Sequence, residues 1–211
     1  MKRPPKEAPG LRLEPDARRA NLLTVGAAAF GAQAYDDVQI DHIAQLAGVS
    51  RGLLYHYFPG KQEFFAAIIQ KGYGDILRVT SPDPELSPMA QLQTSLEAYL
   101  DYVERHPHMY RALFRSGASA HKSIQNEVNR NLEAQAQRIL SALAPTEPPT
   151  PLLRLCVRAW LAFLVNAALD WLDRSPEVDR YQVIGVCIAA LQGAVATALS
   201  SGGTCMPDES S

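Results

Sequence analysis

The chain has 211 residues, 47% of them hydrophobic, and a formal net charge of −2 at pH 7. This apolar share is normal for a globular protein and argues against a chain without a packed core. The net charge alone does not indicate a nucleic-acid partner. Its distribution is more informative: residues 1–72 carry nine Lys/Arg and seven Asp/Glu, a net of +2, whereas residues 73–211 carry eleven and fifteen, a net of −4. The N-terminal end therefore has the sign expected of a segment that meets phosphate.

Cysteine usage and hydropathy argue against a secreted or membrane-spanning class. The three cysteines are far apart in sequence, so no disulfide framework is expected and the chain is interpreted as reduced and cytoplasmic. The charged, proline-rich start has no apolar core typical of a signal peptide. Two apolar stretches, 161–172 and 183–199, are interrupted by polar residues or shorter than the ~20 residues that a span needs. We expect both to be buried helices of a soluble protein with no membrane partner.

The first third of the chain contains four predicted helices behind a short arm. Residues 1–14 hold three prolines and scattered charges, and we expect them to be disordered. Asp16 can cap a helix whose apolar positions are three and four residues apart and which ends at Ala34. Further helices are predicted over 40–47, 50–57 and 60–77.

A proline-rich break at 81–88, with three prolines in eight residues, precedes a larger helical region. Breakers in this region delimit predicted helices over 88–105, 107–115, 120–143, 151–173 and 177–200. No segment shows the period-two alternation typical of a half-buried strand. The sequence therefore predicts an all-α chain of about nine helices.

Residues 39–58 have the spacing of two short helices joined by a tight turn. Gly48 can adopt a positive φ at the turn, Val49 can fill the corner between the helices, and Ser50 can cap the second helix. Ala44 is small where the second helix must cross the first. Apolar side chains of both helices return to one core: Ile40, Ile43, Leu46, Ala47, Leu54 and Phe58. This pattern predicts a helix-turn-helix.

The outward face of the second helix is rich in hydrogen-bond donors. It carries Ser50, Arg51, Tyr55, His56 and Tyr57. Several of these side chains can donate to phosphates or to base edges, and arginine can do both. Gly52 keeps the start of the helix slim, so that the backbone can approach DNA, and Lys61 lies where its charge can reach a phosphate.

The run from Ile43 to Lys61 resembles the signature of TetR-family transcriptional regulators, and with its flanking helices the resemblance covers residues 16–70. Beyond that segment only the length and the helical layout are similar. The resemblance implies a three-helix DNA-binding domain followed by a larger helical domain. It assigns DNA contacts to Gln39, Ser50, Arg51, Gly52, Leu53, Tyr55, His56, Tyr57 and Lys61. In this assignment Tyr55 and Tyr57 hold phosphates, and Lys61 anchors the DNA backbone.

Six residues on three of the later predicted helices are candidates for an effector site: Tyr102, Tyr110, Phe114, Trp160, Phe163 and Asn166. The aromatic side chains form either a packed core or the wall of an apolar ligand cavity. Asn166 is polar within an apolar run and needs a partner, which is either a ligand or a neighbouring helix. The few charges nearby predict a largely apolar effector.

The expected assembly follows from the size of the recognition helix, which reads only a few base pairs. Two copies related by a twofold axis are needed to read a palindromic operator in double-stranded DNA. We expect the helices 151–173 and 177–200 to form half of an intermolecular four-helix bundle in a homodimer. A small-molecule effector would shift the helix 60–77 and change the spacing of the two recognition helices.

The sequence thus predicts a DNA-binding transcriptional repressor released from its operator by a small, largely apolar ligand. Its parts are a disordered arm (1–14), a helix-turn-helix domain (15–62), a ligand-binding and dimerisation domain (63–201) and a disordered tail (202–211). The alternative is a helical ligand-binding or scaffold protein in which the helix-turn-helix is only a packing motif. No catalytic arrangement, cofactor or metal site is expected, because the histidines near 106–121 lack the four tightly spaced ligands of a structural zinc site.

Overall fold

The computed structural model describes residues 14–115, 122–144, 146–174 and 177–201. Within these ranges the chain forms nine α-helices, one turn of 3-10 helix and no strand, so the predicted all-α class is confirmed. The predicted arm, apart from Glu14, and the predicted tail lie outside the described residues.

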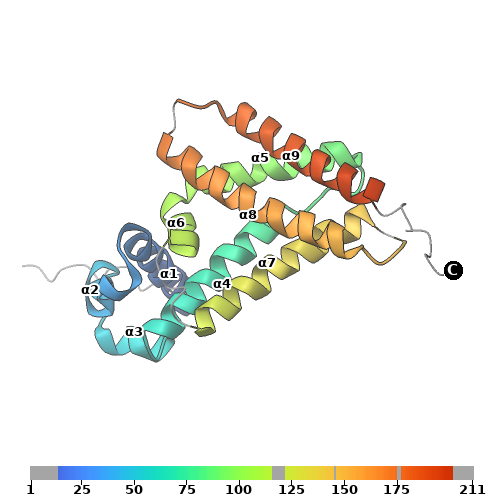
Figure 1. The fold of residues 1–211 in the computed structure, drawn as a ribbon. Helices are drawn as coiled ribbons and strands as arrows, with labels where there is room; N and C mark the ends of the chain where they lie inside the picture. The colour runs from blue at the N-terminus through green and yellow to red at the C-terminus, as the bar shows by residue number, and fades with distance from the viewer. Residues whose placement is uncertain (1–13, 116–121, 145, 175–176, 202–211) are drawn as a thin grey trace, which may run out of the picture.

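The N-terminal helices gather at one end of the molecule, as Figure 1 shows. They are α1 (Pro15–Ala32), the 3-10 turn η1 (Tyr35–Asp37), α2 (Ile40–Leu46) and α3 (Arg51–Tyr57), and we call them the head. The long helix α4 (Lys61–Val79) leaves the head and runs into the remaining helices, which we call the body. The body consists of α5 (Pro88–Arg105), α6 (Pro107–Arg115), α7 (Lys122–Leu143), α8 (Pro151–Arg174) and α9 (Arg180–Ser201).

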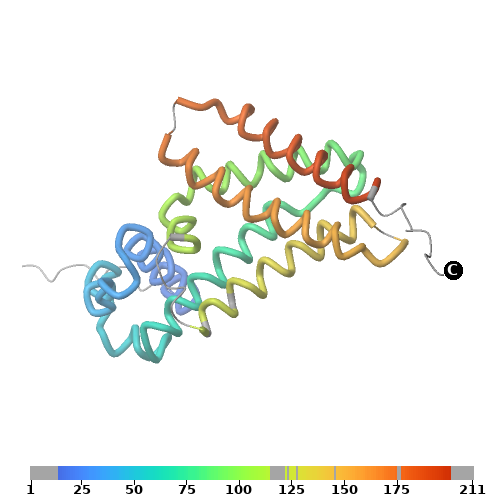
Figure 2. The backbone as a smooth tube through the Cα atoms, in the orientation of Figure 1, coloured from blue at the N-terminus to red at the C-terminus, as the bar shows by residue number. Residues whose placement is uncertain are grey.

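The backbone trace in Figure 2 shows how the body is layered. Helix α4 packs along α7, α7 packs on α8, and α8 packs on α9, so that a continuous series of helices connects the head to the C-terminal pair. The bounds predicted for α5 and α6 agree with the structure, and those of the other body helices differ from it by at most three residues. These boundaries were predictable because prolines occupy the first positions of α5, α6 and α8.

The start and the end of α1 differ from the prediction. Glu14 occupies the capping position without a side-chain hydrogen bond, and Pro15 begins the helix, so the predicted cap at Asp16 is wrong. The fixed φ of proline suits the first helical position, which moves the start ahead of Asp16. Asp16 lies in the first turn instead, where its charge favours the helix dipole. The helix ends at Ala32, two residues before the predicted end.

An aromatic cluster forms the core of the head. The Phe30 ring lies 4.5 Å from the Phe65 ring and 5.7 Å from the Tyr35 ring, centre to centre, and the Phe58 ring lies 4.7 Å from the Phe64 ring. Two of these residues belong to the first turns of α4. The head core therefore extends into α4, and the boundary proposed between residues 62 and 63 falls inside a helix that serves both regions.

The head also contacts the body through α6, which packs against α1. The two helices approach so closely that a Cβ atom added at Gly31 would lie 2.2 Å from the backbone oxygen of His108. A Cβ at Gly72 of α4 would lie 3.0 to 3.1 Å from Leu113 and Met109 of the same α6. Helix α6 is thus held against both α1 and α4, and a displacement of α6 would press on the head directly.

Candidate nucleic-acid interface

The predicted turn between α2 and α3 is confirmed in detail. Gly48 has a φ of 67° and is the one described glycine with a positive φ. The Val49 N–H donates to the Ala44 oxygen at 3.0 Å, and the Ser50 hydroxyl accepts from the Leu53 N–H at 3.2 Å as the cap of α3. The turn therefore fixes α3 relative to α2 by local hydrogen bonds that the sequence already specifies.

Most of the apolar positions of the motif point inward as predicted. The buried ones are Ile40, Ile43, Ala44, Leu54 and Phe58. Leu46 is the exception and the prediction for it is wrong, because this side chain is 60% exposed. Leu46 is the last residue of α2, and Ala47, packed against the core, takes the inward position at the end of the stripe.

The exposed side of α3, which we call the recognition face, consists of Ser50, Arg51, Gly52, Tyr55 and His56. A Cβ atom added at Gly52 would meet no atom of the described residues within 4 Å. The packing of the described chain therefore does not require a glycine at this position. A close approach of α3 to the backbone of DNA would require one, because it leaves no room for a side chain. The Arg51 side chain is 67% exposed and its Nε lies 2.7 Å from a carboxylate oxygen of Asp41 on α2.

The other predicted DNA contacts surround this face. Gln39 is exposed at the start of α2, and Leu53 is half-buried on α3. The Tyr57 hydroxyl donates to the Pro15 oxygen at 3.3 Å. The Lys61 ammonium donates to the Asp36 oxygen at 3.0 Å and lies 4.8 Å from the centre of the Tyr35 ring. In the unbound chain Tyr57 therefore connects α3 to α1, and Lys61 connects α4 to η1. Both remain proposals as DNA contacts.

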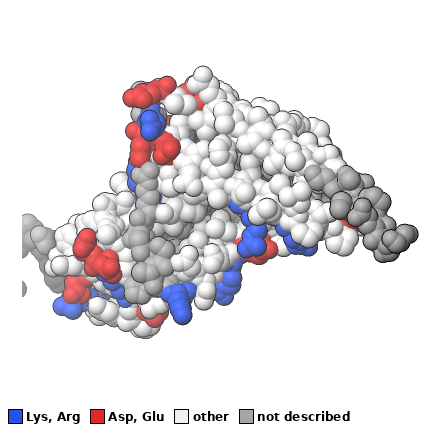
Figure 3. All heavy atoms as spheres, in the orientation of Figure 1, with Lys and Arg blue, Asp and Glu red and all other residues white. Residues whose placement is uncertain are grey.

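The charge of the described head is not basic. Residues 14–72, which are the head and the first part of α4, contain five Lys/Arg and six Asp/Glu, a net of −1. The positive balance of the N-terminal third therefore comes from residues 1–13, which contain four Lys/Arg and one Asp/Glu. Figure 3 shows acidic and basic side chains mixed over the head end of the molecule. The described head therefore offers hydrogen-bond donors in a fixed geometry rather than a broad positive field.

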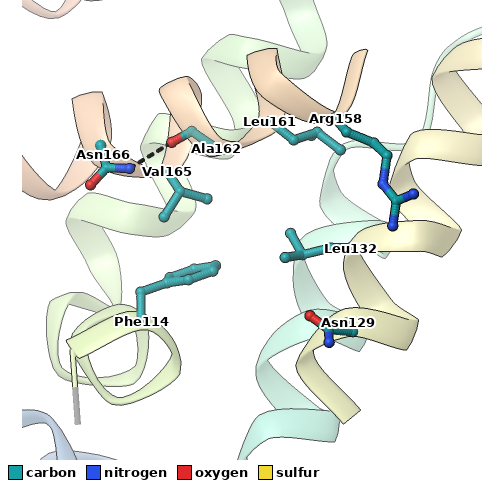
Figure 4. A pocket seen from close by; sticks show the side chains of 8 residues that line it. All are labelled: Phe114, Asn129, Leu132, Arg158, Leu161, Ala162, Val165 and Asn166. Carbon is teal, nitrogen blue, oxygen red and sulfur yellow. Dashed lines mark hydrogen bonds between the residues drawn. The ribbon is translucent and has the colours of Figure 1, made fainter. Parts of the chain in front are cut away.

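A cavity of about 340 Å³ lies between α6, α7 and α8 in the body (Figure 4). This size falls within the range of small-molecule sites. Its wall consists of Phe114, Asn129, Leu132, Arg158, Leu161, Ala162, Val165 and Asn166. Apolar side chains dominate the wall, the amide of Asn166 donates to the Ala162 oxygen at 2.8 Å, and Arg158 is paired with Glu133 at 3.1 Å.

The structure brings only two of the six predicted effector residues to this cavity, Phe114 and Asn166. Tyr110 is buried immediately behind it, with its ring centre 4.9 Å from that of Phe114. The other three lie elsewhere. Tyr102 packs on His106 with 4.7 Å between ring centres, at a separate hollow between α4 and α5.

Trp160 and Phe163 lie on other faces of α8. The Trp160 indole N–H donates to the Cys187 oxygen of α9 at 2.8 Å, and Phe163 is 40% exposed on the outside of the molecule. The predicted ring of aromatic residues around one cavity is therefore wrong. Helical periodicity turns positions 160 and 163 away from the side that carries 158, 162 and 166. The same spacing, counted back from Asn166, would have found the missed Arg158.

Two surfaces of α8 and α9 are apolar and uncovered, and we call them together the apolar face. It includes Leu155, Phe163, Val186 and Leu199, which are 63%, 40%, 57% and 61% exposed. In the view of Figure 3 the surface over these helices carries few charged side chains. Both helices are long and apolar enough to span a membrane by length and composition, yet only a minority of each is buried. The expectation of two buried helices is therefore wrong for the described part of a single chain, because one side of each helix has no partner among these residues.

Comparisons with known proteins cover both regions. Residues 22–68 match the family described as bacterial regulatory proteins, tetR family, and residues 88–188 match the tetracyclin repressor-like C-terminal domain. A tetR-family transcriptional regulator from Streptomyces coelicolor, solved by crystallography, is 31% identical with a TM-score of 0.69, over 89% of this chain and 90% of that one. The transcriptional activator FasR of Mycolicibacterium smegmatis is 26% identical, over 81% of this chain and 80% of its own. The transcriptional repressor SCO4008 of Streptomyces coelicolor is 25% identical, over 82% and 86%.

Proposed function

The chain belongs to the TetR family of helix-turn-helix transcriptional regulators, and from that premise we propose that it is a repressor with an apolar effector. The dimer binds a palindromic operator and leaves it when a small, largely apolar molecule occupies the cavity between α6, α7 and α8. The observation that supports DNA binding is the recognition face, where the packing of the described chain does not require a glycine at position 52. The chain acts in the cytoplasm, where the operator is, and has no catalytic role.

The proposed DNA contacts divide into two kinds. Arg51, at the start of α3, reads a base edge, since arginine pairs well with guanine in the major groove. Gln39, Tyr55, Tyr57 and Lys61 hold phosphates on either side. Because Tyr57 and Lys61 contact Pro15 and Asp36 in the free protein, DNA binding exchanges internal hydrogen bonds for contacts to phosphate at these two positions.

Dimerisation is supported by the apolar face of α8 and α9. The small residues Gly185, Ala189, Gly193 and Ala196 are all exposed along one helix. A Cβ atom added at Gly185 or Gly193 would meet nothing within 4 Å in the described part of the single chain. A second copy packed here would form a four-helix bundle and cover the exposed apolar side chains.

The route from the cavity to the head runs through α6. Phe114 lines the cavity from α6, and Arg111 of the same helix is paired with Asp173 of α8 at 3.2 Å. The opposite part of α6 touches α1 at the close contact of Gly31 with His108. An effector that displaces Phe114 therefore shifts α1 and the recognition faces of the dimer. The resulting loss of affinity is expected to be about 1–3 kcal/mol.

Selection from a random duplex DNA library with the full-length protein tests this proposal without a known operator. We expect an enriched palindrome whose half-sites are separated by one helical turn or a multiple of it. Binding of the enriched duplex should weaken as salt rises. Recovery of no enriched sequence, or of a motif without twofold symmetry, would contradict the dimeric operator complex.

A further inference from the structure

A buried group of tyrosines lies directly behind the inner wall of the cavity. Tyr73 of α4, Tyr99 of α5 and Tyr110 of α6 are at most 5% exposed, and we call them the tyrosine cluster. Phe114 separates this cluster from the cavity. Its ring centre lies 5.8 Å from that of Tyr73 and 4.9 Å from that of Tyr110, while the same ring lines the cavity. The partition at this point is a single side chain.

Val165 forms a second link between the cluster and the cavity. Its side chain lines the cavity, and its carbonyl oxygen accepts a hydrogen bond from the Tyr110 hydroxyl at 3.3 Å. The hydroxyls of Tyr99 and Tyr110 also hydrogen-bond to each other. Because Tyr110 uses its one proton on Val165, Tyr99 is the donor of that second bond.

The third hydroxyl of the cluster has no partner. The hydroxyl of Tyr73 is buried and has no hydrogen-bond partner among the described residues. Buried hydroxyls in native proteins nearly always have a partner, so an orphaned one needs an explanation. The bonds of Tyr99 to Tyr110 and of Tyr110 to Val165 do not include the Tyr73 hydroxyl. An acceptor from outside the chain would give the Tyr73 hydroxyl the partner that it lacks.

The electrostatics favour a neutral acceptor. Burial, followed by the neighbouring Tyr99, raises the pKa of Tyr73 above its ordinary value, and burial likewise raises the pKa of Tyr110. Both hydroxyls therefore keep their protons at physiological pH, and the unpaired proton of Tyr73 can be matched only by an acceptor. Among the described residues, no Lys, Arg or His contributes to the shift in the pKa of Tyr73, and Arg158 of the cavity wall is paired with Glu133. A carboxylate carried to the cluster would lose its hydration without gaining a counter-charge.

We propose that the effector cavity extends past Phe114 to the tyrosine cluster, and that the effector is a neutral molecule with an apolar body and one hydrogen-bond acceptor. The apolar body lies against Leu132, Leu161 and Val165, and the Phe114 ring turns aside. A ketone, ester or ether oxygen then accepts a hydrogen bond from the Tyr73 hydroxyl. This inference rests on the proposed function in taking the cavity as the effector site.

Three probes of one shape test the assignment on the full-length protein: methyl naphthyl ketone, ethylnaphthalene and naphthoic acid. Their affinities are measured by calorimetry or ligand-observed NMR. The ketone should bind the wild type about five- to tenfold more tightly than ethylnaphthalene, as one hydrogen bond to a buried donor allows. In Tyr73→Phe that ratio should fall to about one. Tyr102→Phe is the matched control, since Tyr102 is a buried tyrosine at a different hollow, and its ratio should stay at the wild-type value.

Thermal unfolding without any probe provides a second measurement. Tyr73→Phe should raise the melting temperature, because it removes an unpaired buried hydroxyl, whereas Tyr99→Phe should lower it, because it breaks a bond to Tyr110. A lower melting temperature for Tyr73→Phe would mean that the hydroxyl already has a partner such as water, and would overturn the proposal. Equal affinity of ketone and ethylnaphthalene for the wild type, a ketone preference that survives in Tyr73→Phe, or tighter binding of the acid would overturn it as well.

The DNA library selection, run on the same preparations, separates this inference from the proposed function. An enriched palindrome together with no ketone preference contradicts only the tyrosine assignment. A ketone preference together with no enriched DNA contradicts only the assignment as a DNA-binding repressor.

Discussion

The recognition face of the head and the apolar face of the body are both exposed in the single chain, yet the sequence encodes them in different ways. The recognition face is a small set of side chains at fixed distances from the turn glycine Gly48. The apolar face is spread over two helices of more than twenty residues each, and no single position defines it. DNA is read by individual donors, whereas helix association depends on summed apolar area. Substitutions should therefore act locally on the first surface and collectively on the second.

The largest effect is expected from a charge placed in the apolar face. Gly193→Arg puts an unpaired cation into the proposed seam between two copies, at a cost of about 3–5 kcal/mol if it stays buried. The variant should sediment as a monomer and lose binding to the selected palindrome. Gly74→Arg is the control, because Gly74 is also exposed in the body-facing helix α4 and a Cβ there would meet nothing within 4 Å. A dimeric Gly193→Arg, or a monomeric wild type at micromolar concentration, would contradict the bundle.

The next largest effect is expected from one side chain of the recognition face. Arg51→Ala should weaken binding to the selected palindrome by about 1–3 kcal/mol and relax its preference at one base position. Fluorescence anisotropy on the palindrome and on single-base variants measures both effects. Arg105→Ala is matched to it, since Arg105 is an exposed arginine paired with Asp101 at 2.9 Å on α5. Unchanged affinity in Arg51→Ala, or equal losses in both variants, would remove α3 as the reading helix.

Local chemistry explains why the head was predictable from the sequence. The positive φ of Gly48, the Ser50 cap and the buried positions of α2 and α3 each depend on residues within a few positions of one another. The predictions that were wrong in this region concern ends. Pro15 begins α1 ahead of Asp16, and Leu46 projects outward at the last position of α2.

The body was predicted as a set of helices but not as a site. Which side of α8 faces the cavity depends on how α6, α7 and α9 surround it, and composition does not contain that information. Trp160 and Phe163 were therefore assigned to the cavity although one bonds to α9 and the other is exposed. The close contact of Gly31 with His108 was missed for the same reason. A glycine within a helix can indicate close packing, but the sequence does not show which distant backbone packs against it.

A smaller and two-sided effect is expected at Gly52. Gly52→Ala should raise the free energy of unfolding by up to about 1 kcal/mol, because alanine favours a helix more than glycine and the added Cβ meets no protein atom. The same methyl group should weaken DNA binding by standing between α3 and the groove. Thermal unfolding and anisotropy measure the two effects. Gly74→Ala should give the gain in stability alone, and a Gly52→Ala protein with full DNA affinity would show that the backbone does not approach DNA at this point.

The smallest effect is expected from Asp41, whose carboxylate lies 2.7 Å from the Arg51 guanidinium. Both groups are well exposed, so the pair contributes only about 0.2–1 kcal/mol to folding. Its importance should lie in DNA binding, because Asp41 opposes phosphate and restrains Arg51. Asp41→Asn should therefore raise affinity for random duplex about 2–5-fold, the size expected for one charge near phosphate across solvent. Affinity for the selected palindrome should rise less. The ratio of the affinity for the palindrome to the affinity for random duplex should therefore fall.

Asp101→Asn is the matched control for this last comparison, because Asp101 pairs with Arg105 and Arg180 on the body. It should lower the melting temperature and leave both DNA affinities unchanged. Equal gains on random and selected duplex in Asp41→Asn would mean that Asp41 acts only through its charge. A fall in the ratio would mean that it also holds Arg51 in the orientation that reads a base. In that case the DNA specificity of the head depends on the orientation of one side chain. The apolar face of the body contains no such single side chain, because association there depends on the summed apolar area.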